Sequence, residues 1–279
     1  MVFVSIFQLI LQFIYASFAL FTFVLIAGAA SQKVLSPGLL MMCFSFSTLS
    51  LFWTCQVLMN VLHVTISGVF ASFYLTGGKY SSPISKCLQR ALTTSFGSIC
   101  FGSLIVAAIQ TIRFMVRSLK DEKSVVGAIA DCILGCIENL ASYFNFFAYT
   151  ELAIYGRSFV SSAKDCWSLI RRSGVELIVN DVLSGVVLTL GMLAVTVGGS
   201  LYGKFLVSIV LYKLTQSAAE IYIFITALEF LLSYAMLAEM IRSGINTSIV
   251  CFCEEPRGVQ TSNPALYEKY TEVISGYHA

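Results

Sequence analysis

The sequence predicts an all-α protein, a polytopic bundle of about six transmembrane helices with one amphipathic helix at the membrane surface. Hydrophobic residues make up 57% of the 279 residues, and charged residues make up only 11%. Soluble domains carry about 25% charged residues, and a soluble fold of this size has too little interior to hide so much apolar surface. Apolar stretches of about 20 residues or more, enough for a helix to cross a bilayer, recur along the chain.

The first two expected spans are residues 2–30 and 39–75. Residues 36–38 (Ser-Pro-Gly) break the chain between them, because proline and glycine punctuate regular structure. The second segment is long for a single crossing, so we expect it to tilt or to extend beyond the bilayer. Two glycines end it, and a polar loop is expected over residues 77–90.

The later segments complete the six crossings. Residues 91–117 are apolar and rich in small side chains, which predicts a third span. The fourth, residues 131–155, contains polar side chains that a lipid-exposed helix would not tolerate, so it is either buried within the bundle or lies at the interface. The polar residues 156–174 predict the amphipathic surface helix, and the last two spans are expected at residues 175–201 and 217–241.

Lysine and arginine give the expected orientation. With six crossings, the loops on the side of the C-terminus hold slightly more of these residues than the opposite loops, and such an excess favours the cytoplasmic side. A cluster of cations at residues 113–123 opposes this orientation. We expect one transmembrane domain, residues 1–250, followed by a cytoplasmic C-terminal tail, residues 251–279.

Composition and motifs argue against several functions. The net charge of +2 gives no basic surface for nucleic acid. The sequence has no P-loop, dinucleotide-binding, metalloprotease or serine-hydrolase motif, so we expect no enzyme and no cofactor. The nine cysteines lie mostly in apolar segments and resemble no disulfide framework, so they are expected to be reduced. With only two histidines, the sequence predicts no metal site.

Ionisable side chains inside the expected spans are the better guide to function, because they are costly in a membrane unless they pair or serve a pathway. Glu138 and Glu229 lie deep in their segments, and both structural pairing and a functional role remain open for them. Three other carboxylates are expected near segment ends and solvated: Glu151, Asp181 and Glu239.

The fourth segment places a carboxylate, an amide and an aromatic ring near one face. Glu138 and Asn145 are seven residues apart, and Tyr149 follows four residues later. Such a set could receive an organic cation, since a quaternary ammonium donates no hydrogen bond and is bound by aromatic faces. The alternative is the aromatic belt that is common at membrane interfaces.

Two further patterns have both a packing and a pathway interpretation. A polar stripe in the second segment, spaced by three, four and three residues, shares one helix face: Trp53, Gln56, Asn60 and His63. It either holds helices together or lines a path. The paired dipeptides Gly97-Ser98 and Gly102-Ser103 either allow close helix packing or line a translocation path.

Four stretches, in order along the chain, resemble the choline transporter-like family. They are KCLQRALTTSFGSICFGSLIVAAIQTIR (residues 86–113), FWTCQVLMNVLHVTISGVFASFYL (52–75), NFFAYTELAIYGRSFVSSAKDCWSLI (145–170) and IVCFCEE (249–255). The resemblance implies a polytopic transporter of choline or a related cation, in the plasma membrane or an organelle membrane. Family members have more spans than this sequence predicts, so the chain resembles their C-terminal half.

For such a facilitative carrier, five residues are the candidate substrate-binding residues: Trp53, Tyr74, Glu138, Asn145 and Tyr149. The expected partners are choline or a similar organic cation, the lipid bilayer, and a second half or further copies of the chain. The alternative is a non-transporting membrane scaffold or regulatory subunit derived from the same family.

Overall fold

The structure is a computed structural model that describes residues 2–33, 36–77, 82–118, 125–209 and 216–254, together with residues 260, 264, 267 and 268. The chain divides into two compact units, Met1–Leu169 and Ile170–Ala279, which are described separately. Within the described residues the regular elements are helices: α1 (Val2–Ser31), α2 (Pro37–Thr76), α3 (Pro83–Leu92), α4 (Phe96–Ser118), α5 (Val125–Tyr155), α6 (Phe159–Ile209) and α7 (Gln216–Glu254). The all-α prediction is confirmed.

Five stretches of the described helices are long and apolar enough to cross a membrane: α1, α2, α4, Leu177–Ile209 of α6 and Ala218–Glu254 of α7. They coincide with five of the six expected spans. The expected fourth span corresponds to α5, which has 31 residues but is not among these five. Its three carboxylates lower its apolar character, as the sequence already indicated.

Local sequence fixes the ends of α2. The Ser36 hydroxyl accepts a hydrogen bond from the Leu39 amide at 3.4 Å, and Pro37 occupies the first turn, where no amide hydrogen is needed. At the other end, Gly77 adopts the left-handed conformation, with φ of +61°, that suits a glycine C-cap. The helix is 40 residues long, about 60 Å, so it exceeds the thickness of a bilayer core.

Two local predictions are corrected. The polar loop expected at residues 77–90 is wrong in part, because Pro83–Leu92 forms the short helix α3. Its apolar Ile84, Leu88 and Leu92 recur every four residues and give it one apolar face. The expected amphipathic helix at residues 156–174 is the first part of α6, separated from the rest by a kink at Ser173. The expected tail lies mostly outside the described residues, and α7 continues to Glu254.

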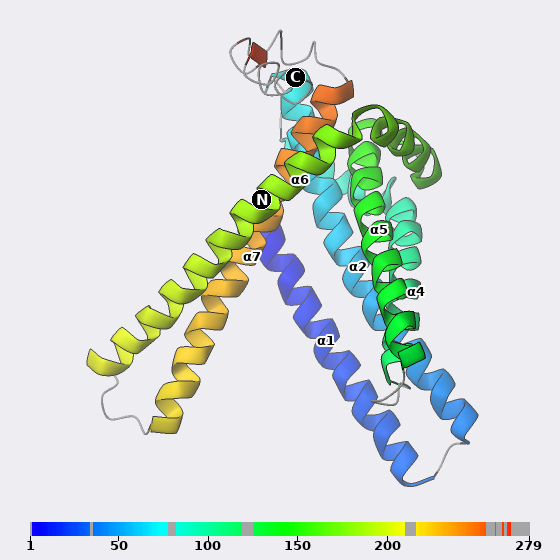
Figure 1. The fold of residues 1–279 in the computed structure, drawn as a ribbon, viewed down its shortest axis with the longest axis vertical. Helices are drawn as coiled ribbons and strands as arrows, with labels where there is room; N and C mark the ends of the chain where they lie inside the picture. Colours follow the sequence, from blue (N-terminus) through cyan, green and yellow to red (C-terminus); the bar gives the residue numbers. More distant parts are fainter. Residues whose placement is uncertain are drawn as a thin grey trace. The chain divides into compact units, whose positions relative to one another are not determined.

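In the first unit, α2 is the central helix. It contacts α1, α3, α4 and α5, and α4 and α5 also contact each other; Figure 1 shows α2, α4 and α5 side by side. This surrounding packing buries residues 62–68 of α2 on every side. The C-terminal half of α5 is equally enclosed, with residues 147–153 all buried. Of the two alternatives for this segment, burial within the bundle is therefore the one that its C-terminal half adopts.

In the second unit, α6 and α7 pack along their lengths in opposite directions. A methyl group at Gly191 would contact Tyr234, one at Gly199 would contact Phe230, and one at Gly203 would contact the Thr226 hydroxyl. As residue numbers rise along α6, those of the partner residues on α7 fall. Small residues thus let the two helices approach closely, which is the usual basis of helix association in membranes.

Candidate functional site

The polar stripe of α2 faces the neighbouring helices of the first unit. The Trp53 indole donates to the Cys100 carbonyl at 2.9 Å. Asn60 donates from its side-chain amide to the Ser103 hydroxyl at 2.8 Å, and Gln56 donates to Gln110 at 3.4 Å. His63 Nε2 lies 3.1 Å from the Phe146 carbonyl of α5. Each member of the stripe therefore joins α2 to another helix.

One turn of α4 receives side chains from both of its neighbours. From α5, Asn145 donates to the Gly102 carbonyl at 2.8 Å, and the Tyr149 hydroxyl donates to the Ile99 carbonyl at 3.0 Å. The same hydroxyl lies 3.3 Å from the Ser103 hydroxyl, which also accepts the hydrogen bond from Asn60. Three of the candidate residues, Trp53, Asn145 and Tyr149, thus converge on the stretch of α4 between residues 99 and 103.

The Gly-Ser dipeptides of α4 have different surroundings. A methyl group at Gly102 would collide with the ring of Phe159 and lie 2.5 Å from the Tyr149 hydroxyl. The Ser98 hydroxyl accepts a hydrogen bond from the Phe159 amide at 3.2 Å, whereas the space around Gly97 is open. Close packing is therefore the role of Gly102 in this conformation, and Gly97 has no such role.

Glu138 lies in a set of charged and amide groups nearer the other end of α5. One carboxylate oxygen accepts a hydrogen bond from Gln110 at 3.1 Å, and the other forms an ion pair with Arg113 at 2.7 Å. Arg113 also contacts Asp131 at 2.8 Å, and Arg117 contacts the same oxygen of Asp131 at 2.7 Å. Two arginines from α4 therefore balance two carboxylates from α5.

These contacts follow one another along the interface of α2, α4 and α5, and we call the set the polar network. On α5 it extends from Asp131 to Thr150, whose hydroxyl lies 3.3 Å from His63 Nε2. These nineteen steps of about 1.5 Å each cover about 28 Å, close to the roughly 30 Å of a bilayer's hydrocarbon core. The network members are Gln56, Asn60, His63, Ser103, Gln110, Arg113, Arg117, Asp131, Glu138, Asn145, Tyr149 and Thr150.

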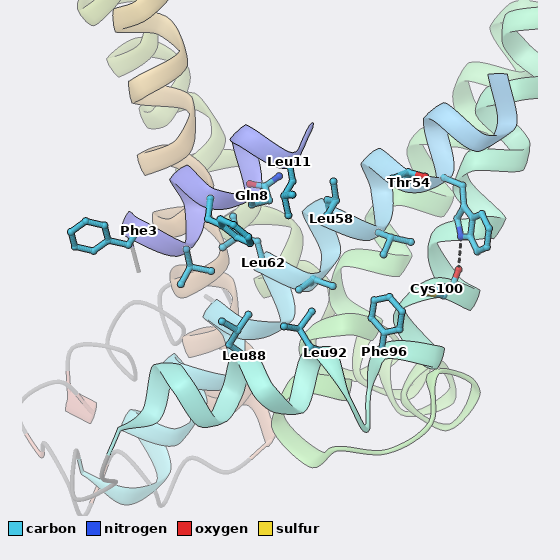
Figure 2. Close-up of a pocket in the computed structure, with 15 residues that line it drawn as sticks. Phe3, Gln8, Leu11, Thr54, Leu58, Leu62, Leu88, Leu92, Phe96 and Cys100 are labelled. Carbon is cyan, nitrogen blue, oxygen red and sulfur yellow. Dashed lines mark hydrogen bonds between the residues drawn. The ribbon is translucent and has the colours of Figure 1, made fainter. Parts of the chain in front are cut away.

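A cavity of about 710 Å³ lies on another side of α2, among α1, α2, α3 and α4. Trp53 lines it and is 37% exposed, while Figure 2 shows Leu11, Leu58 and Leu92 entering it from three different helices. Its fifteen lining residues include no charged side chain, and Gln8 and Thr54 are its polar ones. Its volume is that of a small-molecule site, and its lining suits an apolar group or a group that binds to aromatic faces.

The structure therefore distributes the five candidate residues over different surroundings. Asn145 and Tyr149 are buried, and their polar atoms bond the backbone of α4. Glu138 lies farther along α5 in the same network, and Trp53 lines the cavity. Tyr74 is buried near the C-terminal end of α2, two residues before that helix ends.

Sequence reasoning missed the partners of Glu138. Gln110, Arg113 and Arg117 follow one another on α4 at spacings of three and four, so they share a face. Asp131 and Glu138, seven residues apart on α5, also share one. Matching these two patterns would have suggested the ion pairs. The pairing also bears on the cationic cluster at residues 113–123, because its two arginines are balanced by Asp131 and Glu138; its residues 119–123 lie outside the described ones.

The second unit has a smaller polar cluster of its own. Arg242 of α7 pairs with Asp181 of α6 at 3.2 Å, and Asn246 donates to the same carboxylate at 3.0 Å. Asn180 in turn donates to Asn246 at 3.0 Å. Asn246 begins an Asn-Thr-Ser sequence of the kind used for N-glycosylation, but its side chain is buried in this cluster.

The structure corrects the expectation for the carboxylates placed near segment ends. Glu151 is 1% exposed rather than solvated, because its neighbour Thr150 contacts His63 of α2 and its own carboxylate lies near Cys166 of α6. Asp181 is half-buried and paired with Arg242, and Glu239 is partly buried. Glu229 lies well inside α7, and its side chain is exposed. Among the described residues, no three metal-ligating side chains come together.

Comparison with known proteins gives a consistent family. The family described as plasma-membrane choline transporter matches residues 1–257. A protein named PNS1 from Mycosarcoma maydis is 28% identical over 90% of this chain and 50% of its own length. A CTL-like protein of Dictyostelium discoideum is 32% identical over 92% of this chain and 47% of its own length. The chain thus spans about half the length of these curated relatives.

Proposed function

This chain belongs to the plasma-membrane choline transporter family, and from that premise we propose that it takes part in membrane transport of choline or a related quaternary-ammonium cation. The family is a transporter family and not an enzyme family, and the apolar helices make the chain an integral membrane protein with a lipid bilayer around it. The plasma membrane is the proposed location, from the family description.

The observation that supports this proposal best is the polar network among α2, α4 and α5. Polar and charged side chains inside a membrane protein are costly, and they commonly mark a substrate or ion path. This network follows the interface over about 28 Å, which is close to the thickness of the hydrocarbon core. It contains a carboxylate, Glu138, that can act as the counter-ion of a cation.

The proposed mechanism is facilitated transport by alternating access. A quaternary ammonium offers no hydrogen-bond donor, so it is held by aromatic faces and by negative charge. Trp53 presents a partly exposed indole and Glu138 presents the carboxylate. Asn145 and Tyr149 would act by holding α4 in place, since their polar atoms are bonded to its backbone, and Tyr74 keeps the role of a candidate aromatic contact. The membrane potential contributes about 2.3 kcal/mol per 100 mV to inward movement of one positive charge.

The second candidate is a non-transporting membrane scaffold or regulatory subunit. One observation favours it. The charged groups at residues 113, 117, 131 and 138 balance one another, as expected for ion pairs that only hold α4 and α5 together.

Uptake of radiolabelled choline into proteoliposomes that contain only this chain separates the two candidates. The carrier predicts saturable uptake above that of empty vesicles, and Trp53→Ala is expected to reduce it about tenfold, since a partly desolvated cation–π contact contributes about 1–2 kcal/mol. Phe46→Ala is the matched control, because Phe46 lies on the same helix and is 74% exposed. Uptake equal to that of empty vesicles, by protein shown to be folded, would support the scaffold instead.

A further inference from the structure

The guanidinium group of Arg113 lies over a glycine of the neighbouring helix. A methyl group built on Gly135 of α5 would be 2.7 Å from Arg113 Nη2 and 2.9 Å from its Cζ. Such distances are too short for carbon contacts, so any larger side chain at this position would displace the guanidinium. Gly135 is buried. It also lies inside a helix, where glycine lowers stability relative to alanine.

Gly135 occupies the centre of a regular arrangement on α5. Asp131 precedes it by four residues and Glu138 follows it by three, so the three positions share one helix face. The guanidinium therefore lies over the glycine with a carboxylate on each side. Its Nε donates to Asp131 at 2.8 Å, and its Nη1 donates to Glu138 at 2.7 Å. One arginine can bridge carboxylates two turns apart because nothing projects from the position between them.

The two carboxylates differ in what they retain if this guanidinium moves. Asp131 keeps a second arginine, since Arg117 bonds the same oxygen at 2.7 Å. Among the residues that the structure describes, Glu138 keeps only the neutral Gln110, which donates to its other oxygen at 3.1 Å. The side chains of Arg113, Asp131 and Glu138 are all less than a quarter exposed. Displacing Arg113 towards Asp131 would therefore leave one negative charge at Glu138 in a partly buried place.

We infer that Gly135 is a positioning residue, which leaves room for the Arg113 guanidinium to pair with Glu138. We call this position over Gly135 the seat of Arg113, and Arg113 in its seat the resident cation of Glu138. A substrate cation can pair with the Glu138 carboxylate only when the guanidinium leaves this seat. The inference rests on the proposed function, because it assigns Glu138 to the transported cation. It adds a regulatory step: in the seated state Glu138 is neutralised from within the protein, and a quaternary ammonium must compete with a hydrogen-bonded guanidinium for it.

Gly135→Ala tests the seat without changing any charge. The first measurement is thermal unfolding of Arg113→Gln, Glu138→Gln and the double variant, each with glycine and with alanine at position 135. With glycine, the effects of the two substitutions are expected to be non-additive by about 2–4 °C, because the residues are bonded directly. With alanine, they are expected to add. Non-additivity that persists with alanine at position 135 would contradict the role of Gly135 in positioning Arg113.

The second measurement is calorimetric titration of the purified whole chain with tetramethylammonium and with choline. Gly135→Ala is expected to lower the dissociation constant about tenfold, the scale on which a charge-assisted hydrogen bond competes for a carboxylate. The gain is expected to disappear in the Gly135→Ala, Glu138→Gln double variant. Gly198→Ala is the matched control, because a methyl group there meets no atom within 4 Å and brings the same change of helix propensity.

The outcomes separate this inference from the proposed function. Alanine at position 135 could abolish the non-additivity of the Arg113 and Glu138 substitutions while Gly135→Ala binds the ammonium ions no more tightly than Gly198→Ala does. In that case the role of Arg113 as resident cation is wrong. If neither the unsubstituted chain nor Gly135→Ala binds either ammonium ion, the proposed function fails and the resident-cation role fails with it. In that case the unfolding cycle alone still decides whether Gly135 seats Arg113.

Discussion

The two units of the chain place their polar groups differently. In the first unit, polar side chains follow the contacts among α2, α4 and α5, from Asp131 to Thr150 of α5. In the second unit they gather at one end of the contact between α6 and α7, around Asp181 and Arg242. Farther along that contact, glycines of α6 face larger side chains of α7, such as Gly199 and Phe230.

The number of helices that meet explains this difference. Three helices enclose an interior in which a polar side chain can find a partner on either neighbour, as Ser103 does with Asn60 and Tyr149. Two helices share only one narrow strip, and the large apolar side chains on the remaining surface are exposed. In membranes, such a pair associates best through small residues and close packing. The first unit can therefore hold a long polar network, and the second holds one local cluster.

The largest expected effect tests whether the first unit also depends on a glycine contact. Gly102→Val would drive a side chain into Phe159 and Tyr149, and overpacking of this kind costs about 3 kcal/mol or more. Gly97→Val, five residues earlier on the same helix, has open space and is the control. Thermal unfolding followed by size-exclusion fluorescence measures both. Equal loss of folded protein in the two variants would show that close packing at Gly102 is not decisive.

A smaller effect is expected from the polar cluster of the second unit. Arg242→Gln leaves the Asp181 carboxylate with Asn246 but without its ion-pair partner, and we expect a loss of about 1–2 kcal/mol. Adding Asp181→Asn removes the unbalanced charge, so the double variant should recover most of the lost stability. The shift in unfolding temperature measures both. A double variant as unstable as Arg242→Gln would contradict the ion pair.

The smallest effect concerns cysteine reactivity within the first unit. Cys166 is fully buried, and burial, with a further contribution from the Glu151 carboxylate, raises the pKa of its thiol to about 12. At pH 8 only about one thiol in ten thousand is then the reactive thiolate. We expect N-ethylmaleimide to label the exposed Cys132 and Cys136 of α5 in the folded protein, and to label Cys166 only after denaturation.

Peptide mapping by mass spectrometry measures this labelling, and the Cys132→Ser, Cys136→Ser double variant is the control for the exposed sites. Rapid labelling of Cys166 in folded protein would contradict its burial between α5 and α6. A water-soluble maleimide applied to proteoliposomes extends the test. It distinguishes exposure of the start of α5 to water from exposure to lipid.

Much of the fold could be predicted because apolar length is a local property. Five expected spans coincide with helices that can cross a membrane, and the cap at Ser36 and the glycine at position 77 end α2 where the sequence indicated. Helix α3 was missed because a ten-residue amphipathic helix beside Pro83 has few apolar residues. The burial of Glu151 could not be predicted, since it depends on which helices surround the end of α5.

The candidate site was predicted in part for the same reason. The shared face of Trp53, Gln56, Asn60 and His63 followed from spacing alone, and each of these residues makes a contact with α4 or α5. Their partners could not be read from spacing, because no local pattern says that Asn60 meets Ser103 across 43 residues.

The sequence by itself determined that this chain lies in a membrane, where five helices able to cross it are, and to which family it belongs, because hydropathy and local motifs are local properties of the sequence. Only the tertiary structure decided what the charged residues of α4 and α5 do. Arg113 neutralises Glu138 because α4 and α5 pack with Gly135 facing the guanidinium. The electrostatic energy of a charged side chain in a low-dielectric interior depends mainly on its nearest charged partner. Helix packing, rather than sequence position, decides which residue that partner is.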